Sequence, residues 1–303
     1  MDGLPESDMV GASRGEKGKA MKRLGAGVFG VVAMLWLLSA APSMAAVTCE
    51  FSPSDHLLSV TATDAFTRVL RTGDSIQIDD GHQVVSCQGP NPKIHNTDLI
   101  QVSHTGPSAD AIDLSGGPFA PGFGSQPTGA PEIKFHYVTP TFLDVRGTAG
   151  PDHLTFGAGG INLNGDDDTD VTGAFTTLLV EGHGGNDLIT PQSGYTRAAP
   201  RRIMLGESGN DTLIATPDGS VLHGGNGKDK LIGGAGHDNL TGGRGADVMR
   251  GGKGRDLIRA IDGTRDRVNC GPGVDRAKVD GIDRVKNCEI LIRVKRRGPV
   301  KKH

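Results

Sequence analysis

The sequence predicts an all-β protein, on three observations. A nine-residue pattern repeats four times without a break between Gly224 and Arg259, as GGNGKDKLI, GGAGHDNLT, GGRGADVMR and GGKGRDLIR. Short segments before residue 146, such as HLLSVTAT and DLIQVSHT, alternate apolar and polar residues between Gly, Asp and Pro turns. The chain has 47 glycines, only 4% aromatic residues, and far more Asp than Glu, which favours a thin repetitive core and almost no helix after residue 46.

Each nonapeptide combines a tight loop with a short strand. Glycine at positions 1, 2 and 4 permits positive φ and close backbone approach, so the first six residues form a loop with carbonyl oxygens turned inward. The last three residues extend as a strand in which position 8 points inward and positions 7 and 9 point outward. The inward residues predicted in this way are Leu231, Leu240, Met249 and Ile258.

The pattern G-G-x-G-x-D-x-U-x resembles the calcium-binding repeat of repeats-in-toxin (RTX) proteins. Together with DRVNCGPGVD near the C-terminus, it makes the chain similar to secreted bacterial calcium-binding proteins that carry such repeats. The resemblance implies a parallel β-roll or β-helix solenoid in which two nonapeptides complete one coil. Residues eighteen apart then lie above one another at roughly 4.8 Å.

This stacking aligns the position-6 aspartates in two columns, Asp211, Asp229 and Asp247 on one edge and Asp238 and Asp256 on the other. Two carboxylates about 4.8 Å apart repel by roughly 3 to 4 kcal/mol at an effective dielectric near 20, so a divalent cation is expected between them. Carboxylate and carbonyl oxygens in flexible loops suit Ca²⁺ better than Mg²⁺ or Zn²⁺, and several calcium ions are expected. The predicted metal-site residues are Asp187, Asp211, Gly224, Gly225, Gly227, Asp229, Gly233, Gly234, Gly236, Asp238, Gly242, Gly243, Gly245, Asp247, Gly251, Gly252, Gly254 and Asp256.

Degenerate copies extend the repeat on both sides, so we predict a solenoid over residues 147–290. Copies begin at Gly206, Gly182 and Gly147, and the period slips by six residues at a basic loop, PQSGYTRAAPRR. The β-rich region 46–146 either continues the solenoid or forms a small sandwich. The acidic stretch Asp166, Asp167, Asp168 and Asp170 is either a solenoid calcium site or a solvated turn, because an EF-hand would need glycine where Val171 stands.

The four cysteines and the N-terminus indicate an oxidising compartment. Cys270 and Cys288 are separated by one coil in this geometry, which favours a bridge between them and leaves Cys49 with Cys87, although other pairings are open. Residues 1–45 are predicted to be a signal peptide, with basic residues before an apolar run and a cleavage site before Ala46. A retained transmembrane anchor is the alternative; otherwise the protein is secreted or extracellular, or associated with the cell surface.

The charge of the chain is unevenly distributed. Its tail, residues 291–303, contains six Lys or Arg from Arg293 onward and no acid, whereas the preceding body is acidic. The tail, or the loop Arg197 to Arg202, either contacts an anionic cell-wall polymer or polysaccharide or is merely solvated. An acidic body without aromatic platforms argues against nucleic acid as a partner.

No catalytic motif is recognisable after residue 46, because that part of the sequence contains neither HExxH nor GxSxG; the one GxSxG match, GASRG at residues 11–15, lies in the predicted signal peptide. The ten histidines are scattered without metal-ligand spacing, and we expect them on the surface. Three functions remain in view: a non-catalytic calcium-binding solenoid whose folding depends on the ion, a calcium-rigidified adhesion or polymer-binding module, and a polysaccharide-acting enzyme with a site in 46–146. For the enzyme, the residues to inspect are His82, His95, Asp98 and His104.

Overall fold

The computed structural model describes residues 47–294, apart from 64, 95–96, 98, 106–108, 117–132, 158–159, 164–168 and 193–200. All of them belong to one compact unit, Ser43–His303. Within these residues every regular element is a β-strand, and no helix is long and apolar enough to cross a membrane. The expected signal peptide, and all of the basic tail beyond residue 294, lie outside the described residues. The prediction of an all-β chain is confirmed.

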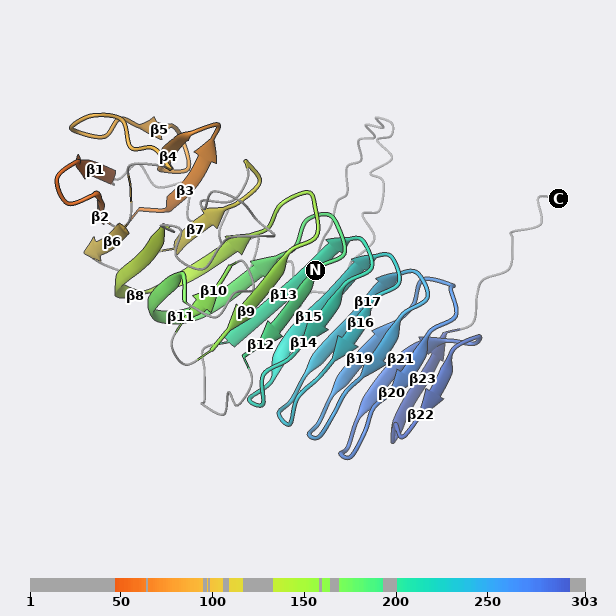
Figure 1. Ribbon diagram of the computed structural model, residues 1–303. Coiled ribbons are helices and arrows are strands. Elements are labelled where there is room, and N and C mark those ends of the chain that lie inside the picture. The colour runs from red at the N-terminus through yellow and green to blue at the C-terminus, as the bar shows by residue number, and fades with distance from the viewer. Residues whose placement is uncertain are drawn as a thin grey trace, which may run out of the picture. The chain divides into compact units, whose positions relative to one another are not determined.

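The repeats form two parallel ladders, one on each side of a thin core (Figure 1). Each strand pairs with the second strand after it along the chain, so the chain alternates between the ladders and closes one coil every two strands. The first ladder consists of β9 (His153–Phe156), β12 (Leu188–Pro191), β14 (Thr212–Ile214), β16 (Lys230–Ile232), β18 (Val248–Arg250), β20 (Arg267–Asn269) and β22 (Arg284–Lys286).

The second ladder is longer and reaches into the N-terminal region. Its strands are β2 (Leu57–Thr63), β6 (Leu99–Thr105), β8 (Lys134–Arg146), β11 (Val171–Glu181), β13 (Arg201–Ser208), β15 (Ser220–Asn226), β17 (Asn239–Arg244), β19 (Leu257–Ala260), β21 (Arg276–Asp280) and β23 (Ile290–Val294). The N-terminal strands therefore continue the parallel stack.

The first coils are irregular. β8 pairs through its first half with β6 and through its second half with β7 (Ala109–Asp113), which in turn pairs in parallel with β3 (Thr67–Thr72). Antiparallel neighbours flank this end of the stack, namely β1 (Val47–Ser52) beside β2, and β4 (Ser75–Asp79) with β5 (Val84–Val85) beside β3. β10 (Ile161–Asn162) pairs antiparallel with β9 and β11.

The register of the ladders is that of an eighteen-residue coil. Leu222 is aligned with Leu240, and Leu231 with Met249, across parallel strands. Ile189 is aligned with Leu213, twenty-four residues later, which matches the six-residue slip expected between these copies. The parallel solenoid of nonapeptides is confirmed.

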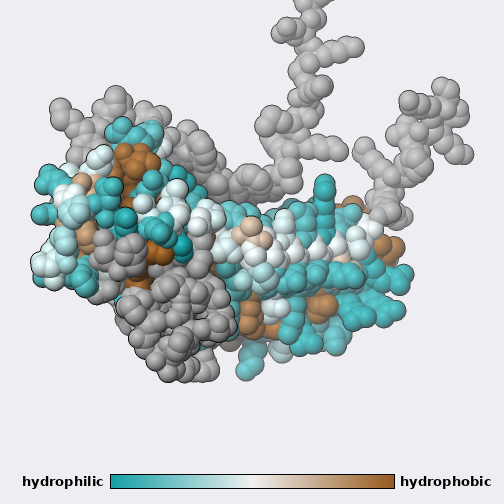
Figure 2. Space-filling model, turned by 45° about the horizontal axis from the view of Figure 1, so that its top comes forward, coloured by the Kyte–Doolittle hydropathy of each residue, from teal (hydrophilic) through white to brown (hydrophobic). Residues whose placement is uncertain are grey.

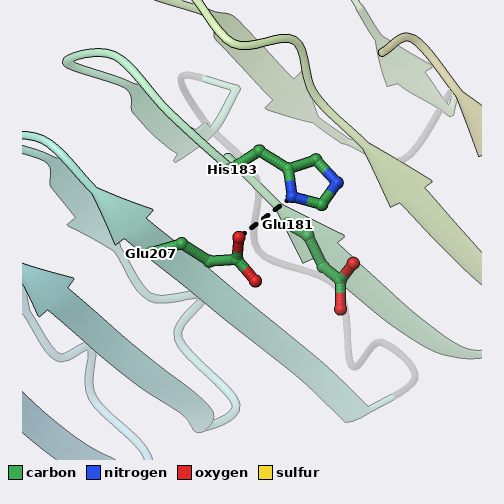
Figure 3. A group of neighbouring side chains, drawn as sticks. All are labelled: Glu181, His183 and Glu207. Atoms are coloured by element: carbon green, nitrogen blue, oxygen red, sulfur yellow. Dashed lines mark hydrogen bonds and ion pairs between the residues drawn. The ribbon is translucent and has the colours of Figure 1, made fainter.

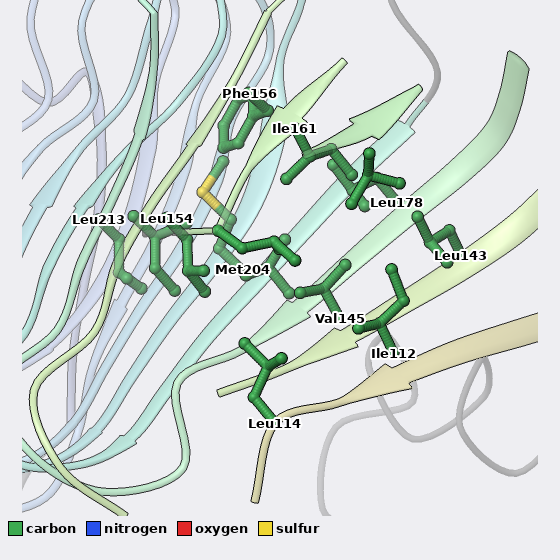
Figure 4. Close-up of a cluster of buried hydrophobic side chains, with 14 of the residues drawn as sticks. Ile112, Leu114, Leu143, Val145, Leu154, Phe156, Ile161, Leu178, Met204 and Leu213 are labelled. Carbon is green, nitrogen blue, oxygen red and sulfur yellow. The ribbon is translucent and has the colours of Figure 1, made fainter. Parts of the chain in front are cut away.

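The core runs through the middle of the stack. The four position-8 residues predicted to point inward, Leu231, Leu240, Met249 and Ile258, are each 0% exposed. Toward the N-terminus the core becomes wider, and Leu154, Phe156, Leu178 and Met204 pack in one continuous cluster (Figure 4). On the outer face shown in Figure 2, hydrophobic groups are interspersed with hydrophilic side chains. One apolar residue per nonapeptide is enough to define the inside of the repeats.

Two disulfides lie near the two ends of the stack. Cys49 is bonded to Cys87, with Cα atoms 4.5 Å apart, and Cys270 is bonded to Cys288, with Cα atoms 5.2 Å apart. The second bridge spans eighteen residues and joins two consecutive coils at the C-terminal end. Both pairs are those favoured by the cysteine spacing.

Candidate metal centre

The loops between the two ladders contain glycines with positive φ, a conformation that other residues rarely adopt. Gly225 has φ of 112° and Gly227 has φ of 144°, both in the region that side chains disfavour. A Cβ added to Gly227 would overlap the carbonyl oxygen of Gly209 in the preceding coil. Glycine at position 4 is therefore required because the loop backbones of neighbouring coils touch.

The position-6 aspartates stack in columns that hydrogen bonds hold in register. The backbone N–H of Asp211 donates to Oδ1 of Asp229, and that of Asp229 donates to Oδ1 of Asp247, both at 2.9 Å. On the other edge the N–H of Asp238 donates to Oδ1 of Asp256, also at 2.9 Å. These carboxylates are almost fully buried, with 1 to 2% of each residue exposed. The two columns expected from the sequence are therefore both present as stacks.

The columns extend further than the residues singled out from the sequence. Upstream, the N–H of Asp152 donates to Asp187, which donates in turn to Asp211. Downstream the same contact adds two further residues to each column, none of them predicted from the sequence. These are Asp266 and Asp283 in one column and Asp275 and Glu289 in the other. The spacing from Asp247 to Asp266 is nineteen residues instead of eighteen, because one residue is inserted between them. A search that allowed one inserted residue per coil would have found the continuation of the column.

In most of these carboxylates only Oδ1 has a partner; Asp238 is an exception, because its Oδ2 accepts a hydrogen bond from the backbone N–H of Gly234 at 2.7 Å. The other oxygen, Oδ2, is buried without a hydrogen-bond partner among the described residues at Asp187, Asp211, Asp229, Asp247, Asp256 and Asp275. Since the backbone N–H stabilises half of each carboxylate, the repulsion expected from the sequence is partly offset without a cation. A buried oxygen without a partner is nevertheless costly, and six in one structure require a ligand.

The missing Cβ of the position-1 glycine leaves a space next to each of these oxygens except that of Asp275, whose nonapeptide begins with Cys270. A Cβ built on Gly224 would meet Oδ2 of Asp229 and the carbonyl oxygen of Gly242 from the next coil. The same pair of oxygens, one carboxylate and one carbonyl, borders the corresponding spaces at Gly147, Gly182, Gly206, Gly233 and Gly251. Carboxylate and carbonyl oxygens are hard donors, so the residues fit Ca²⁺.

Burial raises the pKa of the column carboxyls. It brings the pKa of Asp187, Asp229 and Asp266 to about 7, and that of Asp238 and Asp247 to about 6. Neighbouring carboxylates add to the shift, as Asp247 and Asp211 do for Asp229, whereas the backbone N–H donors oppose it. A bound cation would reverse this balance, because it favours the ionised form.

Several coils depart from this donor set. Ala215 and Ser220 stand at positions 1 and 6 of one coil, where the Ser220 hydroxyl lies 3.3 Å from the backbone nitrogen of Thr216 in place of a carboxylate. Ala260 and Cys270 also stand at position 1, so a Cβ enters the space that Gly224 leaves open. These three nonapeptides lack the complete combination of a position-1 glycine and a position-6 aspartate.

Two other predicted features, the acidic stretch and the candidate enzyme residues, lie partly outside the described residues. Asp166, Asp167 and Asp168 are outside the described residues, whereas Asp170 is buried and paired with Lys134 at 3.1 Å. Among the enzyme candidates, His95 and Asp98 are also outside the described residues. The expectation that all histidines are surface residues is wrong for His104, which is buried against Asp110 at 2.9 Å.

Comparison with known proteins agrees with this geometry. The family model of the RTX calcium-binding nonapeptide repeat (4 copies) matches residues 205–240 and 223–258. Residues 205–258 are RTX calcium-binding nonapeptide repeats. No curated protein and no solved structure matches the chain. The RTX repeats thus cover the block in which glycine and aspartate positions are most regular, and the degenerate coils lie on both sides of it.

Proposed function

We propose that the protein is a secreted, non-catalytic calcium-binding solenoid whose folding depends on the ion. The observation that carries the proposal is the row of buried Oδ2 atoms without partners among the described residues, four of which, at Asp187, Asp211, Asp229 and Asp256, lie around a space that a carbonyl oxygen of the next coil also borders. Asp187, Asp211, Asp229, Asp238, Asp247 and Asp256, with the glycines of their loops, would hold the ions. Calcium supplies the positive charge that these stacked carboxylates lack.

The ions would contribute a large share of the stability of the repeats. Extracellular calcium modules bind with dissociation constants of about 10⁻⁴ to 10⁻³ M. At a tenfold excess over that constant, each site stabilises the folded state by roughly 1.4 kcal/mol. Where calcium is scarce, as before export, the coils would stay open because the carboxylates repel one another.

Calcium titration by isothermal calorimetry tests the proposal. Asp229→Asn and Asp247→Asn should each lower the number of bound ions, because each removes a negative Oδ2 from the column. Lys228→Gln, at the exposed position 5 of the same loop, is the matched control and should bind as the unchanged protein does. Equal stoichiometry in all four proteins would reject this assignment of the sites.

Export is part of the same proposal. Residues 1–45 would be a signal peptide removed before Ala46, which agrees with the two disulfides, since such bonds persist in oxidising compartments. Mass spectrometry of the protein from the culture medium should give a chain that begins at Ala46. An intact N-terminus in a membrane fraction would favour the anchor instead.

The non-catalytic part of the proposal has its own test. His82 is exposed, whereas His104 is buried with Nε2 2.9 Å from Oδ2 of Asp110, so these two candidates for a catalytic group have different surroundings. A turnover screen on glycans and esters, with the calcium-loaded protein, should show no activity. Activity lost in a His95→Ala or Asp98→Ala variant would establish the enzyme hypothesis.

A second candidate function, binding of an anionic polymer, is favoured by the outer face of the first ladder. An open groove of about 660 Å³ runs over β18, β20 and β22, and no acidic residue is among its lining residues. Exposed cations project there from consecutive coils, and these are Arg250, Arg267, Arg284 and Lys286. Arg267 is aligned with Arg284, and strands in a ladder are about 4.8 Å apart. A regularly charged polyanion would offset their mutual repulsion.

Retention on immobilised heparin measures this second function. Arg267→Gln with Arg284→Gln should elute at lower salt than the unchanged protein, because two cations of the groove are lost. Removal of residues 295–303 separates the contribution of the tail. If the double variant elutes unchanged and the tail deletion does not, the tail rather than the groove is the contact.

A further inference from the structure

Two residues that are not glycine have positive φ at a loop position where the regular RTX repeats have glycine. His183 has φ of 67° and Glu207 has φ of 68°, both at loop position 2, where Gly225 and Gly243 stand in the regular copies. Gly184 and Ser208 are bridged in parallel, so His183 and Glu207 occupy neighbouring coils at the same level. Bulky side chains at positive φ are strained, and here the strain brings two metal-ligand types together.

Glu181, at the end of β11, completes a group with these two residues. One ligand atom from each of the three side chains lies within 4.8 Å of the others. His183 Nδ1 and Glu207 Oε2 are 2.9 Å apart, and this contact is the dashed line in Figure 3. The side chain of His183 is 36% exposed and that of Glu207 is 41% exposed, whereas that of Glu181 is 14% exposed. The group is therefore open to solvent on one side and supported by a buried carboxylate on the other.

The surrounding charge favours a cation. Arg146 is the nearest positive side chain, with Nε 3.5 Å from Glu181, but its guanidinium is also bonded to Asp144 at 2.8 Å. The carboxylates of Asp144 and Glu181 thus share one guanidinium, and Glu207 adds a third negative charge beside Glu181. The sequence analysis found no metal-ligand spacing for any histidine, because this group forms only when the coils stack.

We propose that Glu181, His183 and Glu207 bind a divalent transition-metal ion, with Zn²⁺ as the best fit. An imidazole nitrogen with two carboxylates is a donor set that suits zinc, whereas calcium prefers oxygen ligands alone. Three protein ligands leave one tetrahedral position for water or for a group from outside. The site lies on the loop surface outside the aspartate columns, and it shares no ligand residue with them.

The regular repeats indicate substitutions that remove a ligand without disturbing the loop. His183→Gly and Glu207→Gly each remove one ligand and restore the glycine that position 2 has in Gly225 and Gly243. Both changes relieve a positive-φ strain, so the fold should be retained. His153→Ala removes an exposed histidine at position 7 of another coil and is the matched control.

Zinc chloride is titrated by calorimetry into the purified protein in saturating calcium. We expect one tight zinc ion in the unchanged protein and in His153→Ala, and affinity about tenfold lower or worse in His183→Gly and Glu207→Gly. Calcium stoichiometry and far-UV circular dichroism should stay the same in all four proteins. Zinc-edge absorption spectroscopy should detect one imidazole ligand in the unchanged protein and none in His183→Gly.

Three results would overturn the proposal. The first is absence of zinc binding by the unchanged protein. The second is unaltered zinc affinity in both glycine variants, which would place any zinc at another histidine. The third is stoichiometric displacement of zinc by millimolar calcium, which would make the group one more calcium site.

Discussion

The first coils and the RTX repeats share one parallel ladder, but different forces stabilise them. Around β6 and β8 the inside is filled by large apolar side chains such as Ile100, Phe135 and Tyr137, all buried. In the regular repeats each nonapeptide contributes one inward apolar residue at position 8 and one buried aspartate at position 6. Apolar burial stabilises a coil unconditionally, whereas a stack of buried carboxylates is stable only when their charge is neutralised. We therefore expect the same backbone arrangement to be self-sufficient at one end and dependent on an ion at the other.

Removal of calcium by a chelator should give the largest difference between the two regions. In excess EGTA, we expect amide hydrogen exchange to become fast in residues 205–294 and to stay slow in β2, β6 and β8. The reason is that only the repeats lose the charges that hold their coils together. Mass spectrometry of exchanged peptides, with and without calcium, measures both regions in one experiment. Equal protection of the repeats in both conditions would mean that backbone hydrogen bonds alone satisfy the aspartate columns.

The two disulfides should respond differently to calcium. Replacement of both Cys49 and Cys87 by Ala should lower the free energy of unfolding by about 4 kcal/mol, and the same change at Cys270 and Cys288 by about 3 kcal/mol, from their loop lengths. The first loss should persist in EGTA, because the N-terminal coils remain folded there. The second should appear only with calcium, and urea denaturation in both conditions checks this. A C-terminal loss of equal size in EGTA would contradict an ion-dependent repeat region.

A single methyl group in a repeat loop tests the close approach of the coils. Gly227→Ala should lower the free energy of unfolding of the calcium-loaded protein by about 2 to 3 kcal/mol, because its φ is positive and its Cβ overlaps Gly209. Gly281→Ala is the control, since a Cβ there meets no atom within 4 Å. Thermal unfolding followed by circular dichroism compares the two. Similar losses in both variants would show that coil contact at position 4 is unimportant.

The smallest expected effect is a gain of one bound calcium ion and of the stability that it contributes. Ala215→Gly with Ser220→Asp restores the donor pair in the coil that lacks it, and should add a calcium ion worth about 1.4 kcal/mol at tenfold excess. In EGTA the same variant should be less stable than the unchanged protein, because it buries one more carboxylate. Ala215→Gly alone is the control. An unchanged ion count would show that glycine and aspartate are insufficient to make a site.

Much of the repeat could be predicted from local pattern alone. The inward positions of Leu231 and Met249, and the stacking of Asp229 on Asp247, follow from a period of nine that is read directly from the residues. The extension to Asp266 and Asp275 was missed because one inserted residue shifts the count without changing the stack. The N-terminal strands were identified as strands, but their parallel pairing has no sequence signature when strand lengths and loops vary.

What the residues alone determined is therefore the repeating unit, a glycine-rich loop with an aspartate followed by a short strand, because each unit is specified within nine consecutive positions. Only the stacked structure decided that Oδ1 of each aspartate accepts a backbone N–H and that Oδ2 lies beside a carbonyl oxygen of the next coil. It also decided that His183 meets Glu207 from a neighbouring coil. These contacts join residues thirteen or more positions apart, and their distances depend on how coils pack rather than on which residues are adjacent.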